Sequence, residues 1–354
     1  MRRVSEPEIL FEVRGRLGLV TLNRPQALNA LTFAMVRELD AGLRRWASDP
    51  AIAAVAIRGQ GGRAFCAGGD IRAIYDLARE GRAHEAVAFW RTEYGLNALI
   101  HDYPKPYVAL IEGIVMGGGV GVSILGSHRV VAGKVTFAMP EVGIGFYPDV
   151  GATYFLPRLP RRAGLWLALT GARIGAADCL ALGLATHHVP AAEFDTVIAA
   201  LADGAAVDRV LAGLTADAGP APVAVHLAAI ERLFAGDSVE AILAALDAEA
   251  KGGAAAEFAA TAAAAIRTKS PTSLKIAFAQ MRRGADLDFR AAMRTEFRLA
   301  SRILDRPDMI EGVRAVVVDK DNAPRWRPDT LAAVDDATVT AMFAPLGERE
   351  LTFA

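Results

Sequence analysis

The chain has 354 residues, 53% of them hydrophobic, so it is long enough to bury a large core in one or two domains. Its 39 Lys and Arg residues nearly balance its 40 Asp and Glu residues, which excludes the chain-wide positive field of a non-specific nucleic-acid or membrane-surface binder. With two cysteines, Cys66 and Cys179, a disulfide framework and a cysteine-rich zinc site are also excluded.

The first residues lack the apolar stretch of a secretory signal and lead almost at once into a strand-like segment. The longest uncharged run, residues 113–127, is too short to span a membrane and contains six glycines. We therefore expect a soluble, cytoplasmic protein with no membrane partner and no nucleic-acid partner.

The first half of the chain alternates strand-like and helix-like segments. The expected elements, in chain order, are strands at 9–14 and 17–22, a helix at 31–46, a strand at 54–58, a helix at 71–78, a strand at 107–111, a helix from 117 to 125, and strands at 129–132 and 136–138. Repeated strand–loop–helix units favour the α/β class, with a largely parallel sheet and loops gathered at one end.

Beyond residue 162 the pattern is almost entirely helical. Residues 199–265 are very rich in alanine, but their Leu, Ile and Phe residues keep helical spacing. We interpret this stretch as packed helices rather than disorder. The change in composition near residue 200 divides the chain into a core, 1–200, and a mostly helical C-terminal region, 201–354, that packs on the core.

Two glycine loops each lie between a strand and a helix. Gly117-Gly118-Gly119 fits neither dinucleotide nor P-loop spacing, so it either exposes backbone N–H groups to a ligand or allows close helix packing. The other loop is Phe65–Asp70. If their strands are neighbours, the two loops can converge and form an oxyanion hole. In the second loop, Asp70 is interpreted as a helix N-cap, and Cys66 as a buried thiol rather than a nucleophile.

Two acids, Glu141 and Asp149, occur in an apolar stretch bracketed by Pro140 and Pro148. A solvated surface would be less apolar, and the breaks at proline and glycine let both acids face one cavity. Burial would raise their pKa values toward general acid–base use. Asp149 also has a structural interpretation, as the N-cap of a following helix, whereas Glu141 has none.

The histidines give no sign of a metal site. His101 and His128 lack partners at metal-ligand spacing, and the adjacent His187 and His188 would point to opposite faces of a strand. We predict no metal and no cofactor.

Three motifs, F-C-A-G-G-D-I at 65–71, M-G-G-G-V-G at 116–121 and M-P-E at 139–141, together resemble the crotonase (enoyl-CoA hydratase/isomerase) superfamily. The resemblance implies a spiral of ββα units that binds an acyl-CoA, with coenzyme A entering as part of the substrate, and a possible homo-oligomer. It implies an oxyanion hole made by the N–H groups of Ala67 and Gly118. It also implies substrate-binding roles for Arg24, Gly68, Gly69, Asp70, Glu93 and Gly117.

Departures from the superfamily pattern indicate a branch. Hydratases carry a first catalytic Glu two residues after the glycine triplet, where this chain has Gly121; their second Glu matches Glu141, and Asp149 is an additional acid. This exchange resembles the 3-hydroxyisobutyryl-CoA hydrolase branch. It implies thioester hydrolysis with Glu141 as nucleophile or general base and Asp149 binding the substrate hydroxyl or assisting proton transfer. The alternatives are an enoyl-CoA hydratase or isomerase and, more distantly, a non-catalytic acyl-CoA-binding protein.

Overall fold

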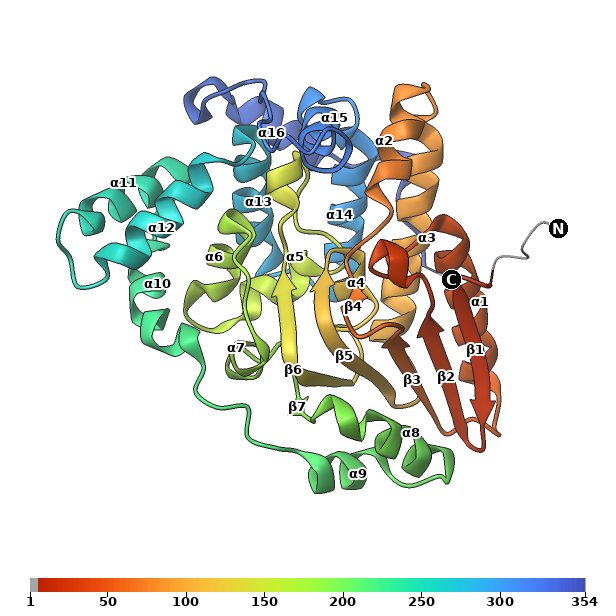
Figure 1. Cartoon of the computed structure of the whole chain (residues 1–354). Coiled ribbons are helices and arrows are strands. Elements are labelled where there is room, and N and C mark those ends of the chain that lie inside the picture. Colours follow the sequence, from red (N-terminus) through yellow and green to blue (C-terminus); the bar gives the residue numbers. More distant parts are fainter. Residues whose placement is uncertain (1–5, 354) are drawn as a thin grey trace. The chain divides into compact units, whose positions relative to one another are not determined.

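The computed structural model describes residues 6–353 (Figure 1), so the first five residues of the stretch expected to lack a signal lie outside it. Its contacts divide the chain into two compact units. Unit 1 comprises Met1–Gly69, Gly95–Phe137 and Ile174–Ala221, and unit 2 comprises Asp70–Tyr94, Ala138–Arg173 and Pro222–Ala354. This division differs from the expected split at residue 200, because the chain enters each unit three times.

The strands form one seven-stranded sheet in the order β1-β2-β3-β5-β6-β7, with β4 paired to β5. The β1–β2 hairpin is antiparallel, whereas the pairs β2–β3, β3–β5, β4–β5 and β6–β7 are parallel. The expected α/β class with a largely parallel sheet is therefore confirmed. The strands are β1 (Ile9–Arg14), β2 (Leu17–Leu22), β3 (Ala54–Gly59), β4 (Ala64–Cys66), β5 (Tyr107–Met116), β6 (His128–Ala138) and β7 (His187–His188).

Helices of unit 1 cover both faces of the sheet. Inward residues of the strands, such as Leu19 and Val108, form a core with α8 (Phe194–Ala202) and α9 (Val207–Leu214) (Figure 1). Side chains alternate between the faces of a strand, so Gly18 belongs to the opposite face. There it leaves room for Trp46 of α1 (Phe33–Ser48).

The remaining helices include one that the sequence patterns did not predict, α3. In α3 the buried side chains mix Trp90 and Tyr94 with Glu93, so no clean apolar stripe marks the helix. The glycine-initiated helix is a single turn, α4, and the two strands expected between 129 and 138 are one strand, β6. The helices other than α1, α8 and α9 are α2 (Ile71–Arg79), α3 (Ala83–His101), α4 (Gly118–Gly121), α5 (Ala152–Phe155), α6 (Ala163–Thr170), α7 (Ala176–Ala181), α10 (Leu227–Leu233), α11 (Val239–Ala250), α12 (Ala256–Arg267), α13 (Pro271–Gly284), α14 (Phe289–Ile303), α15 (Pro307–Val313) and α16 (Asp336–Met342).

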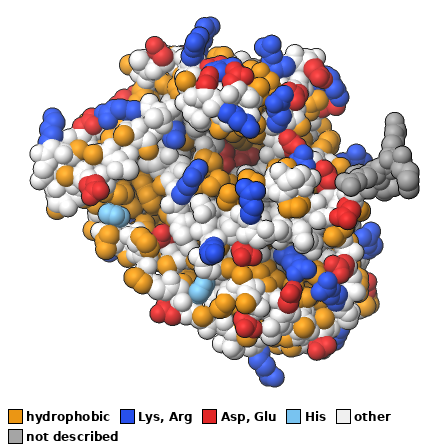
Figure 2. All heavy atoms as spheres, viewed as in Figure 1, with side chains coloured by type: hydrophobic (Ala, Val, Ile, Leu, Met, Phe, Trp, Pro, Cys, Tyr) orange, Lys and Arg blue, Asp and Glu red, His pale blue; other side chains and the backbone are white. Residues whose placement is uncertain are grey.

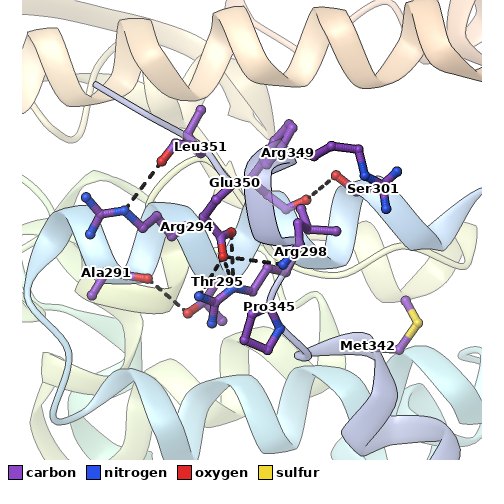
Figure 3. A network of polar contacts seen from close by, with 12 residues as sticks. Ala291, Arg294, Thr295, Arg298, Ser301, Met342, Pro345, Arg349, Glu350 and Leu351 are labelled. Atoms are coloured by element: carbon purple, nitrogen blue, oxygen red, sulfur yellow. Dashed lines mark hydrogen bonds and ion pairs between the residues drawn. The ribbon is translucent and has the colours of Figure 1, made fainter. Parts of the chain in front are cut away.

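Unit 2 contains most of the C-terminal helices. The alanine-rich stretch forms helices, including the packed pair α11 and α12, as expected. The C-terminal segment that contains Glu350 and Leu351 lies along α14 (Figure 3). There Arg298 forms a bidentate ion pair with Glu350, and Arg294 donates to the Leu351 carbonyl. Leu351 is buried, so this segment is an integral part of the unit.

Surface composition agrees with the near-zero net charge. On the face drawn in Figure 2, basic and acidic side chains are interspersed, with hydrophobic side chains between them. No helix within residues 6–353 is long and apolar enough to cross a membrane.

Candidate active site

Glu141 stands directly after the sheet, at the start of a 3-10 helix, Glu141–Ile144. Strand β6 ends at Ala138, and Pro140 is the N-cap residue of the 3-10 helix. Gly145, in the left-handed region with φ +72°, closes the helix by donating its N–H to the Glu141 carbonyl. The Glu141 side chain is only 6% exposed, and its Oε2 finds no hydrogen-bond partner among the described residues. A buried acceptor left without a donor costs free energy, which is typical of a site built for a ligand.

Asp149 lies in the same unit, eight positions later, and is 5% exposed. Its Oδ2 accepts a 2.8 Å hydrogen bond from the Tyr94 hydroxyl. The Asp149 side chain does not cap the following helix. Helix α5 begins at Ala152, and its N-cap residue is Gly151, so no side-chain capping hydrogen bond is formed at this position. The structural interpretation of Asp149 as an N-cap is therefore wrong, since its carboxyl is directed to a tyrosine.

Two buried tyrosines connect Asp149 to the rest of unit 2. The Tyr94 and Tyr147 hydroxyl oxygens are 3.2 Å apart, and Tyr147 donates to the Glu296 carbonyl at 2.6 Å. Each phenol has one proton, so when Tyr147 donates to Glu296, the Tyr94 proton is available for Asp149. An ionised Asp149 is the better acceptor of this bond.

Helix α3 brings a third acid to this cluster. Glu93 precedes Tyr94, is 2% exposed, and its Oε1 has no hydrogen-bond partner among residues 6–353. Trp90, one turn earlier, stacks on Phe146 with ring centroids 5.3 Å apart and fixes α3 against the stretch that carries both motif acids. The structure therefore brings Glu93 together with Glu141 and Asp149 in one electrostatic cluster.

Burial dominates the electrostatics of these acids. Burial and the nearby Asp149 raise the pKa of Glu93 and that of Glu141 well above the usual range. Burial raises the pKa of Asp149 to about 7, although the hydrogen bond from Tyr94 acts in the opposite direction. Carboxyls with pKa values near or above neutrality can hold or release a proton under ordinary conditions, as acid–base catalysis needs.

Glu296 and Gln280 belong to this region and were not predicted. Glu296 of α14 accepts from the N–H groups of Gly151 and Thr153, both at 2.8 Å. Gln280 of α13 donates to the Pro148 carbonyl at 2.6 Å and to the Thr153 hydroxyl at 2.7 Å. The groups that hydrogen-bond to Glu296 and Gln280 are more than 120 positions away along the chain, so no local motif marks these two residues. The one available signal was a charged or amide residue on the apolar face of each helix.

In unit 1 the two glycine loops converge, as predicted. Strands β4 and β5 are parallel neighbours. A Cβ at Gly68 would lie 3.9 Å from both the Gly117 Cα and the Gly118 nitrogen, and one at Gly119 would lie 2.3 Å from the Cys66 carbonyl. These glycines therefore serve both earlier interpretations, since they allow close packing and expose backbone.

The Ala67 N–H differs from its expected role. It donates to the Leu28 carbonyl at 3.0 Å, so in this structure its proton is already bonded within the fold. A donor from this loop to a substrate oxygen has to come from a following amide, at Gly68 or Gly69. Gly68 has φ +126°, a conformation that favours glycine.

The other expected site residues have ordinary structural partners. The Cys66 side chain is fully buried and its thiol contacts the Gly68 carbonyl at 3.4 Å, which agrees with the structural interpretation. Asp70 caps α2 by accepting from the Ala73 N–H. Arg24 forms an ion pair with Glu8 at 3.1 Å. No cluster of three or more His, Cys, Asp or Glu residues suited to a metal ion occurs in the described part of the chain.

Comparison with known proteins defines the class. The sequence profile of the Enoyl-CoA hydratase/isomerase family matches residues 17–343, and the chain belongs to this family. Among curated relatives it is similar to the mitochondrial 3-hydroxyisobutyryl-CoA hydrolase of Danio rerio, with 44% identity over 97% of this chain and 91% of the relative. The Homo sapiens protein of the same name is 39% identical over 98% of this chain and 91% of the relative.

Two solved structures are similar over almost the whole chain. One is named a carnitinyl-CoA dehydratase, from Mycobacterium thermoresistibile, with 45% identity, a TM-score of 0.92 and coverage of 98% of this chain and 99% of the other. The second is named an enoyl-CoA hydratase, from Rhodobacter sphaeroides 2.4.1, with 41% identity, a TM-score of 0.92 and coverage of 98% and 100%.

Proposed function

We propose that this protein hydrolyses an acyl-CoA thioester, with 3-hydroxyisobutyryl-CoA as substrate and 3-hydroxyisobutyrate and free CoA as products. The names of the curated relatives support this reaction. The observation that carries it is a pair of buried carboxyl oxygens, Glu93 Oε1 and Glu141 Oε2, that have no hydrogen-bond partner within residues 6–353 and belong to the same electrostatic cluster as Asp149. Such groups are satisfied when a polar substrate or water donates to them.

Thioester hydrolysis needs a carboxylate that attacks the carbonyl carbon or activates water, and N–H donors for the oxygen that becomes negative. We assign the first role to Glu141, as nucleophile or general base. Asp149, with its hydrogen bond from Tyr94, binds the substrate hydroxyl or returns a proton to the leaving thiolate. The amide donors are Gly118 and an amide of the loop that follows Ala67. The carbon–sulfur bond breaks, water supplies OH to the acyl group, and its remaining proton goes to CoA.

The dehydratase and hydratase names of the solved structures point to a second candidate, hydration of an enoyl-CoA. Hydration places water and a proton on adjacent carbons and is best served by two acids at those carbons. The position that carries the first hydratase Glu is Gly121 here, in the turn α4. We therefore favour hydrolysis over hydration.

Hydrolysis of this thioester belongs to valine degradation, and we include that pathway in the proposal. The curated relatives are named mitochondrial. A cytoplasmic location and assembly as a homo-oligomer remain predictions from the sequence. The proposal uses no cofactor, because coenzyme A is part of the substrate.

The test measures release of free thiol from 3-hydroxyisobutyryl-CoA and, separately, loss of the conjugated-thioester absorbance of crotonyl-CoA. We expect rapid thiol release and negligible hydration. Glu141→Gln should keep the fold and lose at least about 10²-fold in kcat/KM, since it removes the nucleophile or principal base. Hydration of crotonyl-CoA at a rate that rivals thiol release would reverse the ranking. Full activity of Glu141→Gln with unchanged thermal stability would place the chemistry elsewhere.

A further inference from the structure

The turn that carries Asp149 has an unusual conformation. Val150 has φ +52° and Gly151 has φ +98°. Positive φ is strained for a β-branched residue, because its Cβ approaches the backbone. Such a conformation persists only when surrounding contacts hold it. The contacts that hold this turn therefore determine where the Asp149 carboxyl points.

Helix α14 supplies the main hold through Glu296. Its two carboxyl oxygens accept from different amides, Oε2 from Gly151 and Oε1 from Thr153, both at 2.8 Å. These are N–H groups at the start of α5, which an N-terminal side chain would normally bind. Glu296 is fully buried and lies 145 positions from Gly151 in sequence. A distant carboxylate thus performs the capping that the sequence pattern suggested for Asp149.

We propose that Glu296 is a positioning residue for the hydrolysis: by holding the Gly151 and Thr153 amides, it leaves the Asp149 carboxyl free to face Tyr94 and the substrate. This inference rests on the proposed function, because Asp149 matters only if the cluster is catalytic. Glu296 itself bonds to the backbone of the turn and acts through Asp149. The same helix also fixes Tyr147, whose hydroxyl donates to the Glu296 carbonyl and lies 3.2 Å from the Tyr94 hydroxyl. Helix α14 therefore supports both Asp149 and, through Tyr147, the tyrosine that donates to Asp149.

The substitution Glu296→Gln tests this role with minimal change of shape. Gln replaces one acceptor oxygen with an NH2 group, which then faces a backbone N–H, so at least one of the two bonds is lost. We expect kcat to fall at least tenfold while KM changes less than threefold, since small misplacement of a catalytic group is costly. Thr295→Val is the matched control, because the buried Thr295 hydroxyl donates to its own helix, at Ala291, and not to the turn. It should keep kcat within twofold.

A double-mutant cycle separates positioning from general destabilisation. In an Asp149→Asn background, Glu296→Gln should cost less than twofold further, because the residue through which it acts is already disabled. Additive losses, or an unchanged kcat in the single variant, would overturn the proposal. If Glu296→Gln does not fold, Glu296→Asp, which keeps the carboxyl group but is one methylene shorter, replaces it in the same cycle.

Hydrogen exchange gives a readout that does not depend on the reaction. The Gly151 and Thr153 amides should exchange at least tenfold faster in Glu296→Gln than in the parent, and should be unchanged in Thr295→Val. If 3-hydroxyisobutyryl-CoA is not hydrolysed, the cycle is measured on whichever acyl-CoA is turned over, so failure of the proposed function remains distinguishable. Unchanged exchange of both amides in Glu296→Gln would show that Glu296 does not hold the Gly151 and Thr153 amides.

Discussion

Asp149 illustrates how one side chain escapes its usual local role. After Pro148 and before a helical segment, an aspartate normally bonds to the first free N–H groups of the helix. Here Glu296 occupies those N–H groups, and Asp149 accepts from Tyr94 instead. The pKa of Asp149, raised by burial to about 7, is a further consequence of this placement. A carboxyl in this state is suited to proton transfer or to binding a hydroxyl.

Asp149→Asn should therefore reduce kcat/KM for 3-hydroxyisobutyryl-CoA by at least about 10²-fold, the lower range of a general acid–base contribution. The measurement is steady-state thiol release, compared with isobutyryl-CoA, which lacks the hydroxyl. A defect confined to the hydroxylated substrate would identify hydroxyl recognition, and an equal defect on both would identify the chemical step. Parental activity on the hydroxylated thioester would remove Asp149 from the site.

At the scale of elements, α14 is bound on two sides. Glu296 faces the turn after Pro148. Arg294 and Arg298 bind the C-terminal segment at Leu351 and Glu350 (Figure 3), and Arg302 donates to the Met342 carbonyl at the end of α16. Arg298 binds both oxygens of Glu350, with Nε donating to Oε1 at 3.1 Å and Nη2 donating to Oε2 at 2.8 Å, and both side chains are about three-quarters buried. Bidentate ion pairs that are partly buried stabilise a fold more than exposed ion pairs do.

A double-mutant cycle with Arg298→Ala and Glu350→Ala should give a coupling free energy of about 1–2 kcal/mol in the free energy of unfolding. The exposed i,i+4 pair Arg72–Asp76, with side chains about half exposed, is the matched control and should give about 0.3–0.5 kcal/mol. Chemical denaturation measures both. Equal couplings for the two pairs would show that the C-terminal contact adds no particular stability to α14.

At the scale of the molecule, the acid cluster reduces stability near neutral pH. Glu93, Glu141, Asp149 and Glu296 are all buried, and burial raises the pKa of each, in the case of Glu296 to about 8. A carboxyl with a raised folded-state pKa stabilises the fold while it is protonated. That contribution is complete below the unfolded-state pKa and is lost as pH rises through the folded-state pKa. Ionisation of the acid cluster therefore costs stability as the pH rises.

Asp149→Asn should thus stabilise the protein at high pH. Asn cannot ionise, so the difference in Tm between variant and parent should grow as pH rises from 4 through 7. Above pH 8 it should correspond to about 4 kcal/mol, because burial raises the pKa of Asp149 from 3.8 to about 7 and each pKa unit is worth about 1.4 kcal/mol. Melting curves between pH 4 and 9 measure this difference. Glu12→Gln, at an exposed ion pair with Arg14, is the control and should show no such growth. A difference that stays constant with pH would mean that Asp149 is not held in a protonated state by burial.

Features that depend on local patterns could be predicted from the amino-acid sequence. The β1–β2 hairpin follows from two strand-like apolar segments that flank Gly15, and α1 from its i,i+4 stripe. The convergence of the glycine loops could be predicted, because both glycine runs follow a strand-like segment and precede a helix-like one, and such loops meet when their strands are neighbours. Glu141 was found for a similar reason, since a carboxylate in an apolar stretch has no local partner.

The hydrogen-bond partners of the acids depend on how distant helices pack. Tyr94, Gln280 and Glu296 come from three helices and meet the turn after Pro148 across 55 to 145 positions of sequence. Contacts between residues so far apart leave no periodic or spaced pattern in one sequence. The cap of α5 shows the difference: local chemistry assigns it to Asp149, but Glu296, a buried carboxyl group on α14, accepts from the Gly151 and Thr153 amides. Packing of distant helices, which local preference does not encode, therefore fixes the hydrogen-bond partners of Asp149.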